Sequence, residues 1–277
     1  EHTLSFVNEN HKEIISLNKQ ADNETVKYYL STKKKFPLVL KGNGKFDKYL
    51  FKGFEWYDEY SDLTGSTVRK YTNKPMEIEI PIFNKANSEK KVSVPVAYLI
   101  PQHFSEIIEI IKAHQIKFNV LKSSKTVKVE KYRFEDVQFA PRPYEGRQLP
   151  SFKCNSFIEK VDVESGTLIV YTNQRQLRVI VNLLELEAPD SFVSWGFFNA
   201  FFERKEYAEA YVMEPYAKQM MKADVSLRNE FYKKLNEEES FRNDGGERLD
   251  FFYKRSPFYD KGENVYPIMR LINKSNI

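Results

Sequence analysis

The hydrophobic period of this chain changes twice, and these changes constrain its fold more than any other sequence feature. Apolar residues recur with moderate helical spacing from His2 to Leu30. From Phe36 to Tyr171 they mostly alternate with polar residues, as in β-strands, and helical spacing returns after Asn173. Helices and strands are therefore segregated along the sequence. This predicts an α+β fold with an N-terminal helix, an antiparallel, sandwich-like β-rich middle and a helical C-terminal third.

The same changes predict three segments. Residues 1–35 would form a connecting helical segment, and residues 36–173 a β-rich domain. That domain would contain one helix, Ser105 to Ala113, whose apolar residues have helical spacing. Residues 174–277 would form a helical region packed on the β-rich domain.

Prolines and turn residues predict how the strands are arranged. Pro75, Pro81 and Pro95 favour edge or bulged strands, because proline cannot donate a ladder hydrogen bond. Residues 161–170 alternate about a Glu-Ser-Gly turn, which predicts a β-hairpin. The last thirty residues contain two prolines and are expected to be irregular.

Charge and composition exclude several classes of protein. Of the 277 residues, 43 are Lys or Arg and 39 are Asp or Glu, and the two signs are interspersed. This mixture predicts a solvated surface and argues against a nucleic-acid partner. No apolar run approaches the 18 or so residues that cross a bilayer, so no transmembrane segment is expected. The chain begins with Glu1 and shows no signal-peptide pattern, so we expect it to be a piece of a longer protein.

A search for catalytic chemistry assigns no residue. Cys154 is the only cysteine, which excludes an internal disulfide, and its strand-like context predicts an inert buried thiol. His103 and Glu106 have the spacing of two zinc ligands, but no histidine follows His114, so an ordinary helix N-terminus is favoured. We therefore predict no catalytic residue, no metal ligand and no cofactor in this chain.

Aromatic and arginine side chains are the candidates for binding. Trp56 and Trp195 lie in aromatic clusters that could stack on sugars, peptides or bases, although core packing is the competing interpretation. Tyr144 and Arg147 lie in a short polar segment, Pro143 to Gln148, that is expected to be an exposed loop. An arginine there could hold a carboxylate with two hydrogen bonds or simply form a surface ion pair. The candidate binding residues are thus Trp56, Tyr144, Arg147 and Trp195.

Two further segments are expected to be structural. Trp195, Phe197 and Phe198 should be mostly core and lead into an amphipathic helix, Phe197 to Met213. Pro215 should lie in the first turn of the next helix. The segment Leu249 to Tyr253 is too apolar for a loose tail. We expect it to pack on the preceding helices, with Arg248 and Arg255 as structural anchors through ion pairs.

Several motifs occur together in a recognisable order. They are Val94-Pro-Val-Ala-Tyr-Leu-Ile-Pro101, Tyr144-Glu-Gly-Arg147, Leu183-Leu-Glu-Leu-Glu-Ala-Pro-Asp-Ser-Phe192, Trp195-Gly-Phe-Phe-Asn199, Lys205-Glu-Tyr-Ala-Glu209, Tyr211-Val-Met-Glu214, Arg248-Leu-Asp-Phe-Phe-Tyr253 and Arg255-Ser-Pro257. As a set they resemble the C-terminal region of bacterial zinc carboxypeptidase-like proteins of the carboxypeptidase A superfamily, a type common in Bacteroidetes. The resemblance spans about Phe46 to Leu271.

This resemblance implies a function for the chain. In such hydrolases a zinc-binding metallopeptidase domain precedes this region and holds the metal ligands and the catalytic glutamate. The chain would then be a non-catalytic accessory region that supports its own upstream peptidase domain or presents substrate to it. Alone it would be inactive, zinc would occur only in the missing domain, and the protein would be periplasmic or secreted.

Two alternatives stay open. One is a binding module that engages polysaccharide, peptide or a partner protein through an aromatic surface. The other is an independent enzyme whose catalytic acids the sequence pattern does not reveal.

Overall fold

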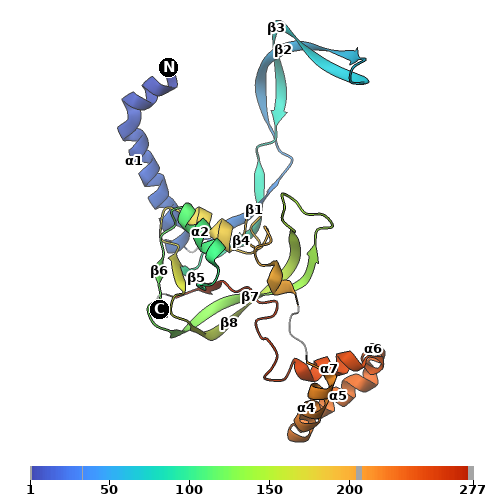
Figure 1. Cartoon of the computed structure of the whole chain (residues 1–277). Coiled ribbons are helices and arrows are strands. Elements are labelled where there is room, and N and C mark those ends of the chain that lie inside the picture. Colours follow the sequence, from blue (N-terminus) through green and yellow to red (C-terminus); the bar gives the residue numbers. More distant parts are fainter. Residues whose placement is uncertain (1, 33, 204–207, 274–277) are drawn as a thin grey trace. The chain divides into compact units, whose positions relative to one another are not determined.

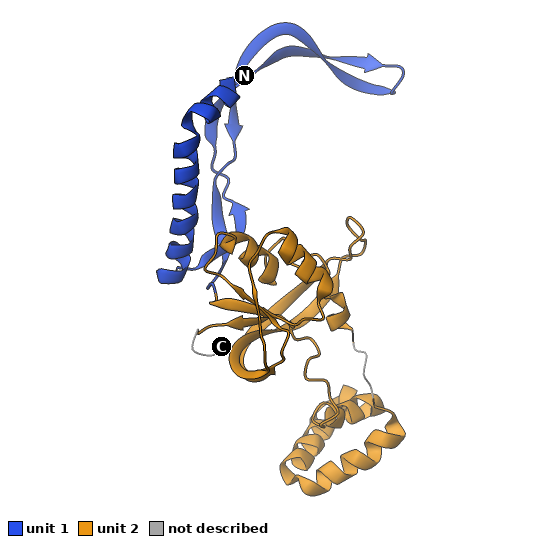
Figure 2. Cartoon of the chain, turned by 60° about the vertical axis from the view of Figure 1, so that its left-hand side comes forward, with its two compact units in different colours: residues 1–94 blue, residues 95–277 orange. Residues whose placement is uncertain are grey.

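The computed structural model describes residues 2–32, 34–203 and 208–273. It divides into two compact units, Glu1–Val94 and Pro95–Ile277, drawn in different colours in Figure 2. The residues of the expected β-rich segment 36–173 are divided between the two units. The three-segment division stays a prediction about domains, and each unit is described here by itself.

Unit 1 contains one long helix and a long β-ribbon. The helix α1 (His2–Ser31) is one continuous helix. Only Tyr29 of α1 is buried, and its ring lies 5.1 Å from that of Phe36. The strands are β1 (Phe36–Gly42), β2 (Asp47–Ser61), β3 (Ser66–Ile82) and β4 (Ala86–Val92).

The four strands of unit 1 form two consecutive antiparallel pairs (Figure 1). β1 pairs with β4 up to Gly42 opposite Ala86, and β2 pairs with β3 from Asp47 opposite Ile82. The backbone N–H of Asn43 donates to the carbonyl of Lys85 (3.1 Å) across the interruption. Each strand is therefore an edge strand. Pro75 and Pro81 both lie in β3, which confirms the prediction for these two prolines. Pro95 lies outside any strand, and the strand that follows it, Ala97–Ile100, is an inner strand of its sheet.

Unit 2 contains a six-stranded antiparallel sheet. Its strands are β5 (Ala97–Ile100), β6 (Asn119–Val120), β7 (Lys125–Phe139), β8 (Pro150–Val163), β9 (Leu168–Tyr171) and β10 (Met269–Leu271). Their order across the sheet is β6-β9-β5-β10-β7-β8. Together with the helices before and after these strands, this confirms the predicted α+β class.

Strand β5 lies inside the sheet and is buried on both faces. Tyr98 and Ile100 point into a core shared with the helices α2 (Ser105–Ala113) and α3 (Leu177–Leu184). Ala97 and Leu99 point into a second core. Strands from both ends of the sheet contribute to this second core. Its other buried residues come from β7, β8, β9 and β10 and are Val127, Val129, Val163, Ile169 and Leu271.

The structure corrects the predicted hairpin. The turn forms, with Gly166 at a φ of +89°, but β8 pairs only with β7, and β9 pairs with β5 and β6. The N–H of Gly166 donates to Leu121 (2.8 Å), and Leu121 in turn donates to Thr167 (2.9 Å). A tight turn therefore carries the chain between distant strands of a curved sheet, which local alternation does not reveal.

A second correction concerns the C-terminal end. The last thirty residues were expected to be irregular, yet Met269–Leu271 form β10, between β5 and β7. Arg270 lies opposite Tyr98 on one side and Glu130 on the other. A strand of three residues is too short to show period-two alternation, so only its tertiary partners define it.

Four helices form a separate aromatic core in unit 2. They are α4 (Ala210–Ala223), α5 (Val225–Glu237), α6 (Glu239–Asn243) and α7 (Gly245–Tyr253). The Asp224 carboxylate caps α5 by accepting from the N–H groups of Ser226 and Leu227, and Asp244 caps α7. The buried side chains of this core are Met213, Ala217, Phe231, Phe241, Phe251, Phe252 and Tyr253.

The prediction for the C-terminal aromatic segment is therefore confirmed. Phe251 and Phe252 pack against Phe231 of α5, with ring centroids 5.7 and 4.9 Å away. Arg255 donates to Glu230 (2.6 Å), which supports its expected anchoring role. The Nε of Arg248 is buried without a hydrogen-bond partner among the described residues, so its expected ion pair is not supported.

The expected helix from Phe197 to Met213 is wrong. The described residues contain a 3-10 helix at Asn199–Phe202, and α4 begins only at Ala210. Residues 204–207, which the expected helix included, lie outside the described residues. Pro215 lies inside α4 and not in its first turn.

We expect Phe198→Ala to destabilise unit 2 strongly. The Phe198 side chain is fully buried, and its ring lies within 5.3 Å of those of Phe104 and Tyr266. Its removal should lower the free energy of unfolding by about 3–5 kcal/mol, because a cavity remains. Phe258, which is 62% exposed, is the control. Its replacement by Ala should cost less than about 1 kcal/mol in the same denaturant titration.

Candidate functional site

A tight turn positions two of the predicted binding residues. Tyr144 and Arg147 exchange two backbone hydrogen bonds, both 2.9 Å long. Between them Glu145 and Gly146 have φ angles of 48° and 76°. Two consecutive positive φ angles are typical of the tightest hairpin turns, which explains the glycine at the second position. The turn fixes the spacing of the aromatic ring and the guanidinium.

The Arg147 guanidinium lies between an aromatic ring and a carboxylate. It stacks on Phe197, 3.9 Å from the ring centroid, and its Nη2 atom lies 3.0 Å from Oε1 of Glu106. Glu106 belongs to the first turn of α2 and is exposed. The cation is therefore held by a ring below it and by a solvent-accessible carboxylate that a ligand could replace.

The segment that carries Trp195 contacts this turn closely. The Trp195 and Tyr144 rings have centroids 6.1 Å apart. Gly196 has a φ of +73°, and a Cβ atom there would come within 2.7 Å of the Gln148 carbonyl oxygen. The same oxygen accepts from the side-chain amide of Asn199 (2.8 Å). The glycine thus permits the close approach that brings the two segments together.

Three of the four predicted binding residues therefore lie together. We call Tyr144, Arg147, Trp195, Phe197 and Glu106 the Arg147 surface. Sequence reasoning missed the last two as site residues. Phe197 and Trp195 were expected in the core, but both are only half-buried. Glu106 was considered only as a possible zinc ligand, and no local pattern pairs it with Arg147.

Trp56, the fourth candidate, lies in unit 1 on β2. Its ring lies under the Arg69 guanidinium, 5.0 Å from the centroid. It is therefore part of a different surface, on the β-ribbon.

The Arg147 surface does not suit a zinc ion. Glu106 is paired with Arg147, and the His103 ring lies against Phe104, with centroids 4.2 Å apart. The described residues contain no group of three or more His, Cys, Asp or Glu side chains placed to hold a metal ion. A cation stacked on a ring favours binding of an anion beside an apolar group, so the arrangement suits recognition of such a ligand.

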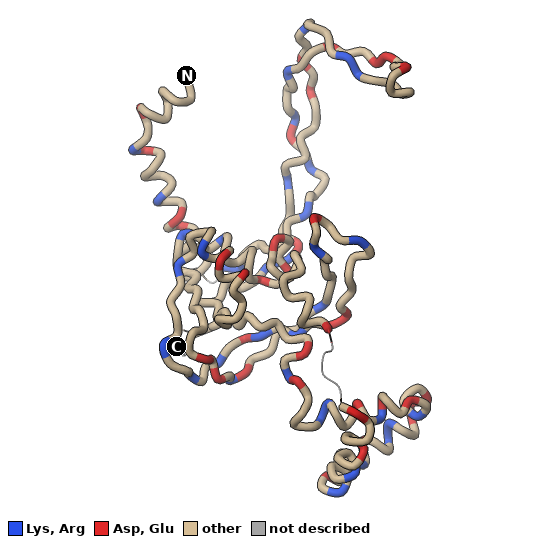
Figure 3. Tube along the Cα trace, viewed as in Figure 1, with Lys and Arg blue, Asp and Glu red and all other residues tan. Residues whose placement is uncertain are grey.

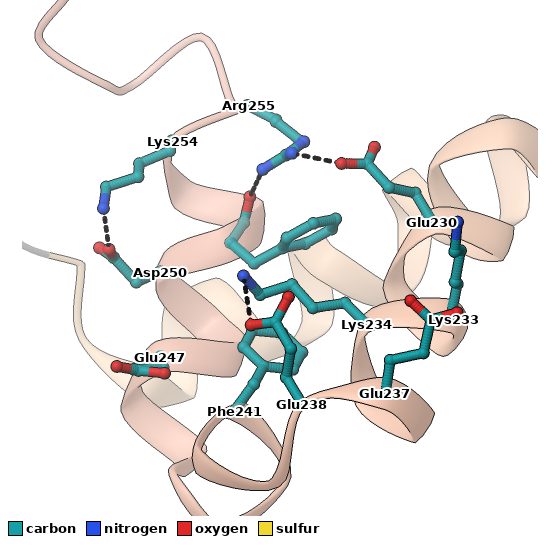
Figure 4. Close-up of a pocket in the computed structure, with 11 residues that line it drawn as sticks. Glu230, Lys233, Lys234, Glu237, Glu238, Phe241, Glu247, Asp250, Lys254 and Arg255 are labelled. Carbon is teal, nitrogen blue, oxygen red and sulfur yellow. Dashed lines mark hydrogen bonds and ion pairs between the residues drawn. The ribbon is translucent and has the colours of Figure 1, made fainter.

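A second candidate is a groove of about 530 Å³ between α5, α6 and α7 (Figure 4). Its side chains carry charges of both signs over two aromatic rings, Phe241 and Phe251. Lys234 lies 5.0 Å from the Phe241 centroid, and Arg255 lies 3.8 Å from that of Phe251.

The charges that line this groove are largely paired with one another. Figure 4 shows Arg255 bonded to Glu230, Lys254 to Asp250 and Lys234 to Glu238, at 2.6, 2.7 and 3.0 Å. A ligand would have to break these ion pairs. We therefore interpret the groove as a solvated face of the four-helix core.

A third candidate is a buried polar cluster around Glu185, at the end of α3. The Glu185 carboxylate accepts from the hydroxyls of Tyr98 (2.5 Å) and Tyr132 (3.2 Å). The Nε atom of Arg270 lies 3.0 Å from the same carboxylate. Arg270 also pairs with Glu130. The side chains of Glu185 and Arg270 are only 2% and 6% exposed, so this cluster is closed to ligands.

Burial dominates the protonation of this cluster. Loss of hydration raises the pKa of Glu185, although the positive charge of Arg270 and the two tyrosine hydroxyls oppose the rise. Burial and the nearby carboxylate also raise the pKa values of Tyr98 and Tyr132. Both tyrosines therefore stay neutral donors at physiological pH. The cluster has a structural role, fastening β10 to α3, β5 and β7.

Neither the distribution of charge nor the apolar character of the helices points to one class of binding partner. Along the chain trace, basic and acidic residues are interspersed in both units (Figure 3). Among the described residues, no helix combines the length and the apolar character needed to cross a membrane.

Comparisons with known proteins give a partial match. Carboxypeptidase 2 from Trichophyton tonsurans and its counterparts from Trichophyton equinum and Trichophyton rubrum are each 30% identical to the chain over 104 residues. This is 38% of the chain but only 19% of the length of those relatives. No family model matches the chain, and no solved structure matches it.

These matches support a carboxypeptidase-like relation and nothing finer. The three relatives are fungal, so they do not support the bacterial, Bacteroidetes type that the motifs suggested. Their shared segment also leaves most of the relatives' length without a counterpart in this chain.

Removal of Arg270 should destabilise the protein in a pH-dependent way. Arg270→Met leaves Glu185 buried without its counter-charge, which should cost about 3–5 kcal/mol near neutral pH. The pKa of Glu185 should rise further in the variant, so the folded state binds a proton that the unfolded state releases. The cost should then be smallest at acidic pH and grow as the pH rises through the new pKa.

The measurement is chemical denaturation of both proteins at several pH values. The double variant Arg270→Met with Glu185→Gln is the control, because it removes the group that titrates. Its deficit should depend little on pH. An Arg270→Met deficit that is constant from acidic to mildly basic pH would contradict this account of the cluster.

Proposed function

We propose that this chain is a non-catalytic accessory region of a zinc metallocarboxypeptidase-like protein and that it holds peptide for an upstream peptidase domain. The observation that carries the proposal is the Arg147 surface, where a half-buried, ring-stacked guanidinium lies beside the Trp195–Tyr144 pair. The partial similarity to fungal carboxypeptidases supports the peptidase context. In this proposal zinc belongs to the upstream domain, and the protein acts in the periplasm or outside the cell.

The geometry suggests how a peptide would bind. The C-terminal carboxylate of the peptide would replace Glu106 as the partner of Arg147, which can offer two parallel donors. An apolar C-terminal side chain would lie against the Trp195 and Tyr144 rings. The exchange costs little, because the exposed ion pair that it breaks is weak.

Arg147→Ala should abolish binding of peptides with a free C-terminal carboxylate. The probe is a short fluorescent peptide ending in phenylalanine, and the same peptide with an amidated C-terminus should bind weakly to the unaltered chain. Arg142→Ala is the matched control, because Arg142 lies in the same loop and is exposed. It should bind as the unaltered chain does. Equal binding by the Arg147 and Arg142 variants would contradict a role for this surface.

The non-catalytic part of the proposal has its own test. The purified chain should release no amino acid from the same peptide, with or without added zinc. Release that a chelator abolishes would show that the chain is an enzyme, and the accessory role would then be wrong.

A second candidate function rests on the distal part of the β-ribbon. Trp56 lies directly opposite Tyr71, and Tyr60 follows four residues later on the same face. Their exposed fractions run from 42% to 70%. Asp58 and Arg69 lie between them and form two hydrogen bonds, of 3.0 and 3.2 Å. Flat rings beside fixed polar groups suit a polysaccharide, and Trp56→Ala should then abolish retention on an insoluble glycan while leaving peptide binding unchanged.

A further inference from the structure

The Arg147 surface holds two opposite charges beside aromatic rings. The Nη2 atom of Arg147 lies 3.0 Å from Oε1 of Glu106, and the two side chains are 36% and 67% exposed. The ring of Phe197 lies under the guanidinium, and the neighbouring Trp195 and Tyr144 rings supply an apolar wall. Water therefore reaches both members of the ion pair, and a small ligand can reach them too.

A peptide C-terminus satisfies only one of these two charges. When its carboxylate binds Arg147, Glu106 loses its partner, and two carboxylates then lie beside one guanidinium. Lys112, on the same helix as Glu106, pairs with Glu109 (2.7 Å) and so does not replace Arg147 as a partner. Like charges at this separation repel, even where water screens them. Glu106 therefore disfavours ligands that carry a carboxylate alone.

A ligand with a cation next to its carboxylate satisfies both charges. In a free α-amino acid, the ammonium and carboxylate groups are attached to the same carbon atom. Between the two side chains, the ligand carboxylate would accept from the Arg147 guanidinium and the ammonium would donate to Glu106. Each protein charge exchanges one partner for another, and each new hydrogen bond is charge-assisted.

We propose that the Arg147 surface binds free apolar or aromatic α-amino acids as zwitterions, and that Glu106 makes it prefer them to peptide C-termini. The inference rests on the proposed function, because it takes Arg147 as the partner of a ligand carboxylate. The side chain of the amino acid would lie against the Trp195 and Tyr144 rings. A carboxypeptidase releases such amino acids, so its product would displace the held peptide.

Three small ligands separate the two charges. L-phenylalanine carries both of them, N-acetyl-L-phenylalanine carries the carboxylate alone, as a peptide C-terminus does, and L-phenylalaninamide carries the ammonium alone. Ligand-observed NMR titration gives the dissociation constant of each. The unaltered chain should bind phenylalanine about five- to tenfold more tightly than either analogue, because only phenylalanine pairs with both side chains.

Two charge-matched variants test the role of Glu106. In Glu106→Gln the preference for phenylalanine over N-acetyl-phenylalanine should disappear, because the partner of the ammonium and the repulsion of the lone carboxylate are both lost. Glu109→Gln removes a negative charge from the same helix, but not the one that faces Arg147. It should keep the preference of the unaltered chain.

The outcomes distinguish this inference from the proposed function. Equal binding of phenylalanine and N-acetyl-phenylalanine by the unaltered chain, with both lost in Arg147→Ala, would overturn the inference and leave the proposed function standing. A preference for phenylalanine that survives Glu106→Gln would also overturn it. Failure of all three ligands and of the fluorescent peptide to bind, or binding that Arg147→Ala leaves unchanged, would contradict both.

Discussion

The ion pair between Glu185 and Arg270 is the interaction on which the architecture of unit 2 depends most. It joins the end of α3 to β10, and through the hydroxyls of Tyr98 and Tyr132 it extends to β5 and β7. The strand that carries Arg270 is only three residues long, so its backbone ladder alone is weak. A buried charge pair is costly to desolvate but very costly to break, which makes it a device that specifies one position for β10.

The Arg147 surface depends on the same sheet. β7 and β8 are joined through the loop that carries Tyr144 and Arg147, and α2, which carries Glu106, packs on the core beneath. Phe198, the neighbour of Phe197, is fully buried in that core. The half-buried guanidinium thus rests on elements whose positions are fixed by burial, as recognition of a ligand requires.

The strands of unit 1 are stabilised differently from those of unit 2. Unit 2 contains three buried apolar cores, whereas the β2–β3 ribbon of unit 1 leaves most of its side chains exposed to solvent. A strand pair of this kind gains its stability from what covers it.

The sequence by itself determined the segregation of helices and strands and the edge character of the proline-bearing strand β3. It also determined the burial of Phe198 and of the segment Leu249 to Tyr253. These features follow from local periodicity, from proline and from apolar content. It also pointed to Tyr144, Arg147 and Trp195 without showing that they meet. Only the tertiary structure decided the partners of β8 and β9, the existence of β10, and the pairing of Glu185 with Arg270. These features depend on residues that are far apart in the sequence. The curvature of the sheet determines which strands pair, and the cost of burying a charge determines which charged residues pair, so no local sequence pattern predicts either.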